Sequence, residues 1–289
     1  MNNCLHKLSI ARIDRIKPGL DDKIILGWNA LMLKGLAKAA IVLEDKNYLQ
    51  YAIANYNCIV NRLLVDATTG EMFHTVKNGK AKFTAFLDDY AFFIDACLQL
   101  YEATFDIIYL TRAKLVCIFV CKHFSDDEKL FFYFTPATQQ DVIVRKKEIY
   151  DGAIPSGNSA MAGNLLKLSV IFDNMEWGER ANKMLIAIAP AATKYPGSFG
   201  IWSSLLLQQQ NGVHEIAITG PESLSLAMDL TAHYFIPNKI IMASTDDEAS
   251  LPMLKSKHSG NSTYIYECKN YVCNSPVETI PDLLKIISK

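Results

Sequence analysis

The chain has 289 residues, of which 50% are hydrophobic and 20% are charged, with 14 Gly and 10 Pro. The length fits about two domains, and the composition excludes disordered, collagen-like and low-complexity proteins. Because 29 Lys and Arg residues nearly balance 30 Asp and Glu residues, the net charge is −1, and no overall field attracts nucleic acid or an anionic membrane. We therefore expect neither as a partner.

The N-terminal residues carry no export signal. Residues 1–14 mix His6, Lys7 and Arg12 with no apolar core, and no stretch of the chain reaches the roughly 18 uninterrupted apolar residues of a membrane span. We therefore expect a cytoplasmic protein. The sequence has no P-loop or dinucleotide fingerprint, and we expect no cofactor and no metal.

Three segments of the chain share one pattern. Each opens with acidic residues, continues into an apolar helix rich in small residues, and ends in a second amphipathic helix. The openings are Asp21-Asp22, Asp88-Asp89 and Asp151, which are 67 (88 − 21) and 63 (151 − 88) residues apart. The expected helices cover residues 24–39 and 48–63, 90–101 and 106–124, and 161–168 (after a turn and cap at 155–158) and 176–191. The repeating unit is thus a helical hairpin of about 65 residues.

The connectors between these hairpins predict short β-hairpins. Residues 71–76 precede a turn at Asn78-Gly79, and residues 130–135 and 142–144 flank a turn around Pro136. Small residues on the first helix of each pair allow close packing, as in the inner ring of a helical toroid. Six such hairpins need about 390 residues, so the sequence predicts a partial (α/α)₆ toroid of about three hairpins.

The pattern changes after about Tyr195. We expect a strand at 214–219, a helix to about Tyr234, a strand at 239–243, a polar linker, a strand at 263–268 and a closing helix at 281–287. These elements predict a small C-terminal α/β layer. The fold class is therefore mainly α, with a helical-hairpin region at 1–200 and an α/β subdomain at 201–289.

Several of these segments also carry a family likeness. The segments are 17–24 KPGLDDKI, 28–32 WNALM, 87–92 LDDYAF, 151–159 DGAIPSGNS and 271–273 YVC. Together they resemble the YyaL-type family of thioredoxin-fused, six-hairpin-glycosidase-like proteins, which includes spermatogenesis-associated thioredoxin-like proteins. Ala30 stands where that family usually has Gly. The resemblance implies an (α/α)₆ toroid and a chain corresponding to the C-terminal half of such a protein.

The acidic openings are the first candidates for chemistry. Glycoside chemistry requires an acid and a base on opposite sides of a sugar, and acids at the starts of the inner helices share one rim. Asp at a helix start can instead cap free N–H groups. One helix has one N-cap, so paired acids are the better candidates. We predict Asp88, Asp89 and Asp22 as catalytic, with Asp21 and Asp151 binding substrate.

Other side chains are expected to shape the same rim. Trp28 and Tyr90 suit stacking on a sugar or packing in the core, and Asn29 and Asn158 suit hydrogen bonding to a hydroxyl or to a loop. Arg145 could hold an anionic group or belong to a solvated charged run. His74, on a connector, could transfer protons as in epimerases or be inert.

The late cysteines allow two interpretations. Cys268 and Cys273 lack a second pair for zinc, which favours core thiols, with a labile redox pair as the alternative. The sequence as a whole favours a carbohydrate-active protein that binds a sugar or glycan, hydrolase-like or epimerase-like in mechanism. The alternative is a non-catalytic binding module. Half a ring would expose apolar flanks, so we also expect a homodimer or a missing N-terminal half.

Overall fold

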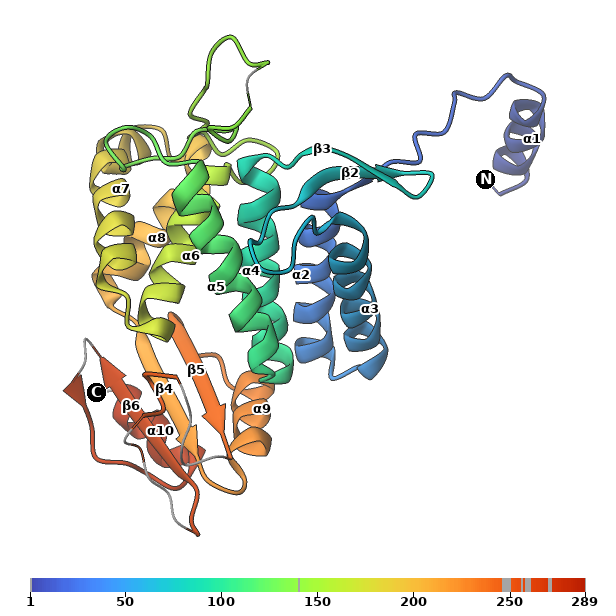
Figure 1. Cartoon of the computed structure of the whole chain (residues 1–289). Helices are drawn as coiled ribbons and strands as arrows, with labels where there is room; N and C mark the ends of the chain where they lie inside the picture. The colour runs from blue at the N-terminus through green and yellow to red at the C-terminus, as the bar shows by residue number, and fades with distance from the viewer. Residues whose placement is uncertain are drawn as a thin grey trace.

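The computed structural model describes residues 2–139, 141–245, 251–255, 257, 261–269 and 272–288. Its architecture is mainly helical: a row of helical hairpins is followed by a small sheet with helices beside it (Figure 1). The fold class expected from the sequence is confirmed.

The three hairpins lie at the positions that the repeat predicts. They comprise α2 (Leu26–Leu43) with α3 (Lys46–Leu63), α4 (Leu87–Thr104) with α5 (Ile107–His123), and α6 (Gly157–Phe172) with α7 (Met175–Lys194). Each second helix packs on its own first helix, and α4 lies between α2 and α6 (Figure 1). The second helices begin at polar caps, since Asp45, Asp106 and Asn174 each accept a backbone N–H of the first turn.

The core is centred on α4, whose largest buried side chains include Tyr90 and Phe93. An ion-pair bridge also joins the first helices of the three hairpins, α2, α4 and α6. The carboxylate of Asp95 on α4 pairs with Lys34 of α2 and Lys167 of α6. Burial opposes ionisation there, but the amines of Lys167 and Lys34 hold the pKa of Asp95 below its ordinary value.

The first predicted β-hairpin is confirmed. β2 (Phe73–Lys77) and β3 (Lys80–Thr84) pair antiparallel around Asn78 and Gly79, whose φ angles of 52° and 72° fit a tight hairpin turn. A short strand, β1 (Ile24–Ile25), pairs with β2 and completes the sheet. The prediction that the first helix begins at residue 24 was therefore wrong, because these two residues are extended.

The second predicted β-hairpin is wrong. Among the described residues of 130–144 there is no strand, and the only β-bridge there joins Phe132 to Ser125. The backbone groups that a hairpin would use are taken elsewhere. Asn158 bonds both backbone groups of Phe132, and Arg145 donates to the carbonyl oxygen of Thr135. Residue 140, in the predicted turn region, lies outside the described residues.

The tail contains the predicted α/β elements. A helix that the sequence did not predict, α8 (Gly200–Asn211), packs on α7. Then follow β4 (His214–Thr219), α9 (Ser223–His233), β5 (Lys239–Ser244), β6 (Tyr264–Lys269), β7 (Val272–Cys273) and α10 (Ile280–Ile287), with strand order β5-β4-β6-β7. β4 and β5 are parallel, as the βαβ pattern predicts, and β6 is antiparallel to β4. Residues 246–250, 256 and 258–260 of the expected linker, and Tyr271, lie outside the described residues.

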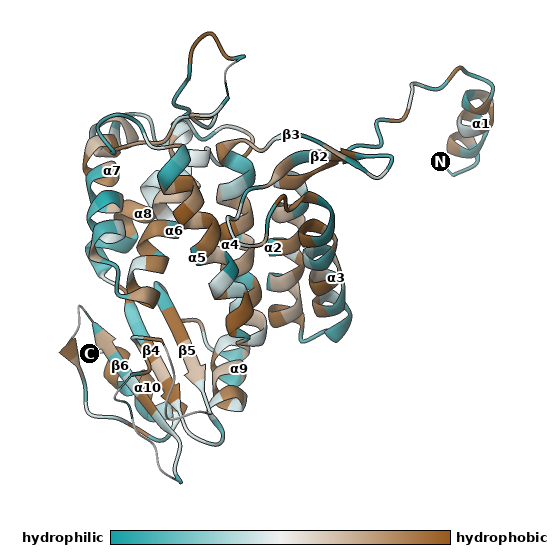
Figure 2. Cartoon of the chain, viewed as in Figure 1, coloured by the Kyte–Doolittle hydropathy of each residue, from teal (hydrophilic) through white to brown (hydrophobic). Residues whose placement is uncertain are grey.

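Hydrophobic residues run along β5 (Figure 2). In α7 hydrophilic and hydrophobic residues are mixed, and the buried ones recur every three to four residues, as expected for a helix with one buried side (Figure 2). Cys268 and Cys273 are opposite each other on β6 and β7 and form a disulfide, so the prediction of core thiols was wrong.

The first inner helix has an open side. Among the described residues, α2 is the one helix that is long and apolar enough to cross a membrane, judged by length and composition alone. A third of this helix is buried in the molecule. Trp28, Met32 and Val42 are exposed, and a Cβ at Gly35 would meet nothing within 4 Å. We call the side made by Met32, Gly35, Ala39 and Val42 the α2 stripe. Its spacing of 3, 4 and 3 residues is that of a coiled-coil seam. α1 (Asn2–Ile13) has no buried residue and lies apart from the hairpins (Figure 1).

Candidate functional site

A cluster of titratable side chains lies where β2 meets the first turns of α2 and α4. β2 and β3 run beside these helix starts, at the end of the hairpins opposite the C-terminal sheet (Figure 1). His74 comes from β2, and Asp88 and Asp89 come from the first turn of α4. The sequence predicted each of these residues, and the structure brings them together.

Asp89 is the centre of the cluster and is 2% exposed. Its Oδ1 accepts the backbone N–H of Gly27 at 2.8 Å, and its Oδ2 accepts that of Phe86 at 2.9 Å. The second bond closes the N-terminus of α4, and the first ties α4 to α2. Asp89 therefore fixes the geometry of the rim, and both of its oxygens are occupied within the chain.

His74 is held by the same carboxylate. Its Nδ1 lies 2.7 Å from Oδ2 of Asp89, and its ring packs on Phe86 with centroids 4.8 Å apart. Because Asp89 is the acceptor, Nδ1 carries the proton, which leaves Nε2 without a hydrogen-bond partner among the described residues. The hydrogen bond to Asp89 raises the pKa of His74, against the effect of burial.

Asp88 behaves differently from its neighbour. Burial and the negative charge of Asp89 raise the pKa of Asp88 to about 6. Its Oδ1 accepts a hydrogen bond from the backbone N–H of Asp89 at 3.0 Å. A half-buried carboxyl with this pKa exchanges its proton close to neutral pH, which suits acid–base chemistry.

The first acidic opening is placed away from a helix start. Asp21 and Asp22 precede β1 and are exposed; Asp21 pairs with Lys23 at 3.2 Å, and Asp22 pairs with Lys77 of β2 at 2.6 Å. The hydrogen bond from Lys77 lowers the pKa of Asp22, which keeps it ionised. The expectation that these two acids lie at the start of an inner helix was wrong, because the β1–β2 pairing separates them from α2.

Trp28 and Asn29 lie in the first turn of α2, directly after Gly27. Trp28 is 66% exposed, so it is free to stack on a ligand. The side-chain amide of Asn29 donates to the carbonyl oxygen of Ile25 at 2.9 Å and braces the junction of β1 with α2.

Two of the predicted site residues, Tyr90 and Asn158, are buried and bonded to the backbone of the chain itself. Tyr90 is fully buried, and its hydroxyl bonds both backbone groups of Met72. Asn158 is also fully buried and donates to the carbonyl oxygens of Phe132 and Glu148. These contacts correct the expectation that Tyr90 and Asn158 face a ligand.

Asp151 and Arg145 hold the long loop before α6. Asp151 accepts from the hydroxyl of Ser159 at 2.6 Å and from the backbone N–H of Ile201 at 2.9 Å. Arg145 donates to the carbonyl oxygen of Thr135 at 2.7 Å and lies over the ring of Tyr133. Both act on the chain itself in this structure.

Two residues of the cluster were missed from the sequence. A Cβ on Gly27 would lie 2.9 Å from Oδ1 of Asp89, so only glycine allows α2 to approach this closely. Phe86 stacks on Phe134 and forms a wall beside His74. No local pattern marks Gly27, because its partner lies 62 residues away.

Nearly the whole chain is similar in sequence to part of longer known proteins. No family model matches it. It is 28% identical to human spermatogenesis-associated protein 20 over 305 aligned positions, covering 99% of this chain and 39% of that protein. The chain is therefore similar to spermatogenesis-associated protein 20 over nearly its whole length. An uncharacterised protein of Caenorhabditis elegans is 30% identical, covering 96% of this chain and 40% of that protein. The chain thus spans about two fifths of the curated relatives it matches.

Solved structures with similar folds are carbohydrate enzymes. They include cellobiose 2-epimerase from Bacillus thermoamylovorans (TM-score 0.46, 14% identity, 64% of this chain and 55% of that chain) and a glycoside hydrolase of family 105 from C. acetobutylicum (TM-score 0.47, 14% identity, 64% and 57%). Likeness at this level transfers neither an activity nor a site. The finer assignment to the YyaL type stays a prediction.

Proposed function

We propose that the rim of the hairpins is an acid–base site for a sugar or glycan, with His74 as the group that transfers the proton. The observation that carries this proposal is the hydrogen bond of 2.7 Å between His74 and the buried carboxylate of Asp89. The carboxylate fixes the ring and its tautomer, which leaves Nε2 to act as base or acid.

Asp88 supplies the second group. With a pKa of about 6, its carboxyl delivers or accepts a proton near neutral pH. Asp89 is unsuited to direct chemistry because its oxygens are occupied by two backbone N–H groups and His74. Hydrolysis by two free carboxylates is therefore less well supported than proton transfer at a sugar carbon.

The ligand class is supported by Trp28 and by the sequence motifs. An exposed indole one residue after Gly27 offers a flat apolar surface of the kind that sugar rings stack on. The six-hairpin family that the motifs resemble implies the same ligand class. These two features support sugar binding by this chain.

The experiment is a proton-exchange assay in D₂O. Reducing mono- and disaccharides are incubated with the protein, and NMR follows deuterium incorporation at C2. We expect exchange by the native chain and a loss of about 100-fold in His74→Gln, with a smaller loss in Asp88→Asn. His6→Gln, on the separate helix α1, is the matched control and should keep full activity.

Two results would contradict the proposal in different ways. Absence of exchange with retained sugar binding, lost in Trp28→Ala, would favour the alternative function of a non-catalytic sugar-binding module. Exchange at the native rate in His74→Gln would remove His74 from the mechanism.

A further inference from the structure

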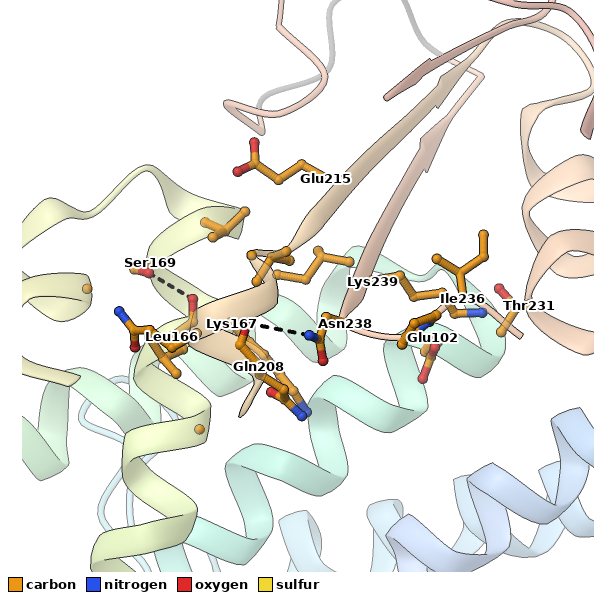
Figure 3. A pocket seen from close by; sticks show the side chains of 18 of the residues that line it. Glu102, Leu166, Lys167, Ser169, Gln208, Glu215, Thr231, Ile236, Asn238 and Lys239 are labelled. Carbon is orange, nitrogen blue, oxygen red and sulfur yellow. Dashed lines mark hydrogen bonds between the residues drawn. The ribbon is translucent and has the colours of Figure 1, made fainter. Parts of the chain in front are cut away.

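A cavity lies at the other end of the hairpins, away from His74. Its volume is about 890 Å³, within the range of small-molecule sites. The ends of the inner helices form one side of it, and β4, β5 and the segment after α9 form the other (Figure 3). It therefore lies between the helical hairpins and the C-terminal layer.

Three amines from three elements line this cavity: Lys38 of α2, Lys167 of α6 and Lys239 of β5. Lys167 is already paired with Asp95. Lys38 and Lys239 have no carboxylate within ion-pair distance among the described residues. The ammonium of Lys239 has one hydrogen bond, to the carbonyl oxygen of Tyr234 at 3.3 Å.

Lys239 is the informative member of this group. Its ammonium donates to the carbonyl oxygen of Tyr234, the C-cap of α9, and thereby offsets the negative pole of that helix with one of its three N–H donors. It is half-buried, and burial lowers its pKa. The charge of Glu102 offsets part of this effect, but no carboxylate lies within ion-pair distance among the described residues, and the ammonium keeps donors for an anion that enters the cavity.

The remaining polar groups suit hydroxyls. One oxygen of Glu102 accepts the amide of Gln99, which leaves the other oxygen available. Gln208 and Asn238 present amides, which both donate and accept, as hydroxyl recognition requires. Figure 3 shows Gln208 and Asn238 beside Lys167, with Lys239 and Glu102 next to them and Glu215 apart from this group.

We propose that this cavity binds a small phosphorylated polyol, such as a sugar monophosphate. Lys38 and Lys239 hold the phosphate, for which lysine is a common point-charge partner. Glu102 and the amides of Gln208 and Asn238 bond the hydroxyls. The described lining contains no arginine, the residue best suited to a planar carboxylate, and this favours phosphate over carboxylate as the anion.

The proposal is tested by calorimetric titration of the native chain with a set of hexose and pentose monophosphates, the free sugars and inorganic phosphate. We expect at least one sugar monophosphate to bind about tenfold more tightly than either inorganic phosphate or its free sugar. Lys239→Met and Lys38→Met should each weaken that binding by about tenfold. Lys46→Met, exposed at the start of α3, is the matched control and should bind as the native chain does.

Three results would overturn the proposal: no binding of any sugar monophosphate up to about 10 mM, equal affinity for inorganic phosphate, or undiminished binding in both lysine variants. Lys38 is exposed, so its replacement leaves the fold intact even if Lys239→Met unfolds the chain. His74→Gln should leave this binding unchanged, which separates the cavity from the proton-transfer site.

Discussion

Replacing Asp89 with asparagine tests the central claim about the rim. The substitution keeps the volume but replaces one carboxylate oxygen by an amide that donates. At least one of the three donors, Gly27, Phe86 or His74, then loses its acceptor, and the buried charge that strengthens all three bonds disappears. Hydrogen bonds to charged groups contribute about 1.5–3 kcal/mol each, so we expect a loss of about 3–5 kcal/mol in unfolding free energy.

The loss should depend on pH in a defined direction. His74 has a raised pKa in the folded state, so its pairing with Asp89 stabilises the fold below the unfolded pKa of about 6.5. That contribution is lost as the pH rises through the raised value. The difference between native and Asp89→Asn should therefore be larger at pH 6 than at about pH 9.

Urea unfolding at the two pH values measures the difference, and NMR titration of the His74 ring measures its pKa, which should fall in the variant. Asp45→Asn is the matched control, because Asp45 caps α3 at an exposed position where asparagine caps equally well. A variant at position 89 that is as stable as native, with the His74 pKa unchanged, would refute the proposed role of Asp89.

Three further predictions concern α2 and the start of α4. Gly27→Ala should cost about 1–3 kcal/mol in urea unfolding, because its Cβ would press on Asp89, whereas Gly35→Ala, with open space around it, should be neutral or stabilising. Asp88→Asn should stabilise the fold by about 1–3 kcal/mol at pH 8 and not at pH 3. The pKa of Asp88 rises from 3.8 to about 6 in the folded state, so ionisation of this carboxyl destabilises the fold at the higher pH. Equal effects at both pH values would contradict this prediction. The α2 stripe should cause self-association, and light scattering should show Met32→Glu shifted to monomer, while a native chain that stays monomeric at high concentration would be the contrary result.

Much of the fold could be predicted from the sequence because its signals are local. Apolar residues repeat at helical spacing through the three hairpins, and Asn78-Gly79 marks a tight turn. The wrong predictions concern backbone groups whose hydrogen-bond partners lie far away in the sequence. Residues 130–135 form an apolar, aromatic run of the kind found in strands, but Asn158, 26 residues beyond Phe132, bonds both backbone groups of Phe132. No window of the sequence contains that competition.

Of the residues predicted for the site, His74, Asp88 and Asp89 lie together in the structure, but the sequence did not reveal their separate positions or the contributions of Gly27 and Phe86. The adjacent acids Asp88 and Asp89 look equivalent in the sequence, and a helical turn places them on different sides of α4. Asp89 accepts the N–H groups of Gly27 and Phe86, whereas Asp88 has a pKa suited to proton exchange. His74 acquires its orientation from Asp89, 15 residues away, which spacing alone does not reveal.

The bridge formed by Asp95 affects how the molecule comes apart. Repeat proteins whose units touch only their neighbours can lose one unit at a time, starting from an end. Here one carboxylate on the middle hairpin is shared by an amine from each of the two flanking hairpins. Detaching either flanking hairpin leaves that half-buried carboxylate with one of its two amine partners. Hydrogen exchange should therefore show α2, α4 and α6 opening together as a single cooperative unit.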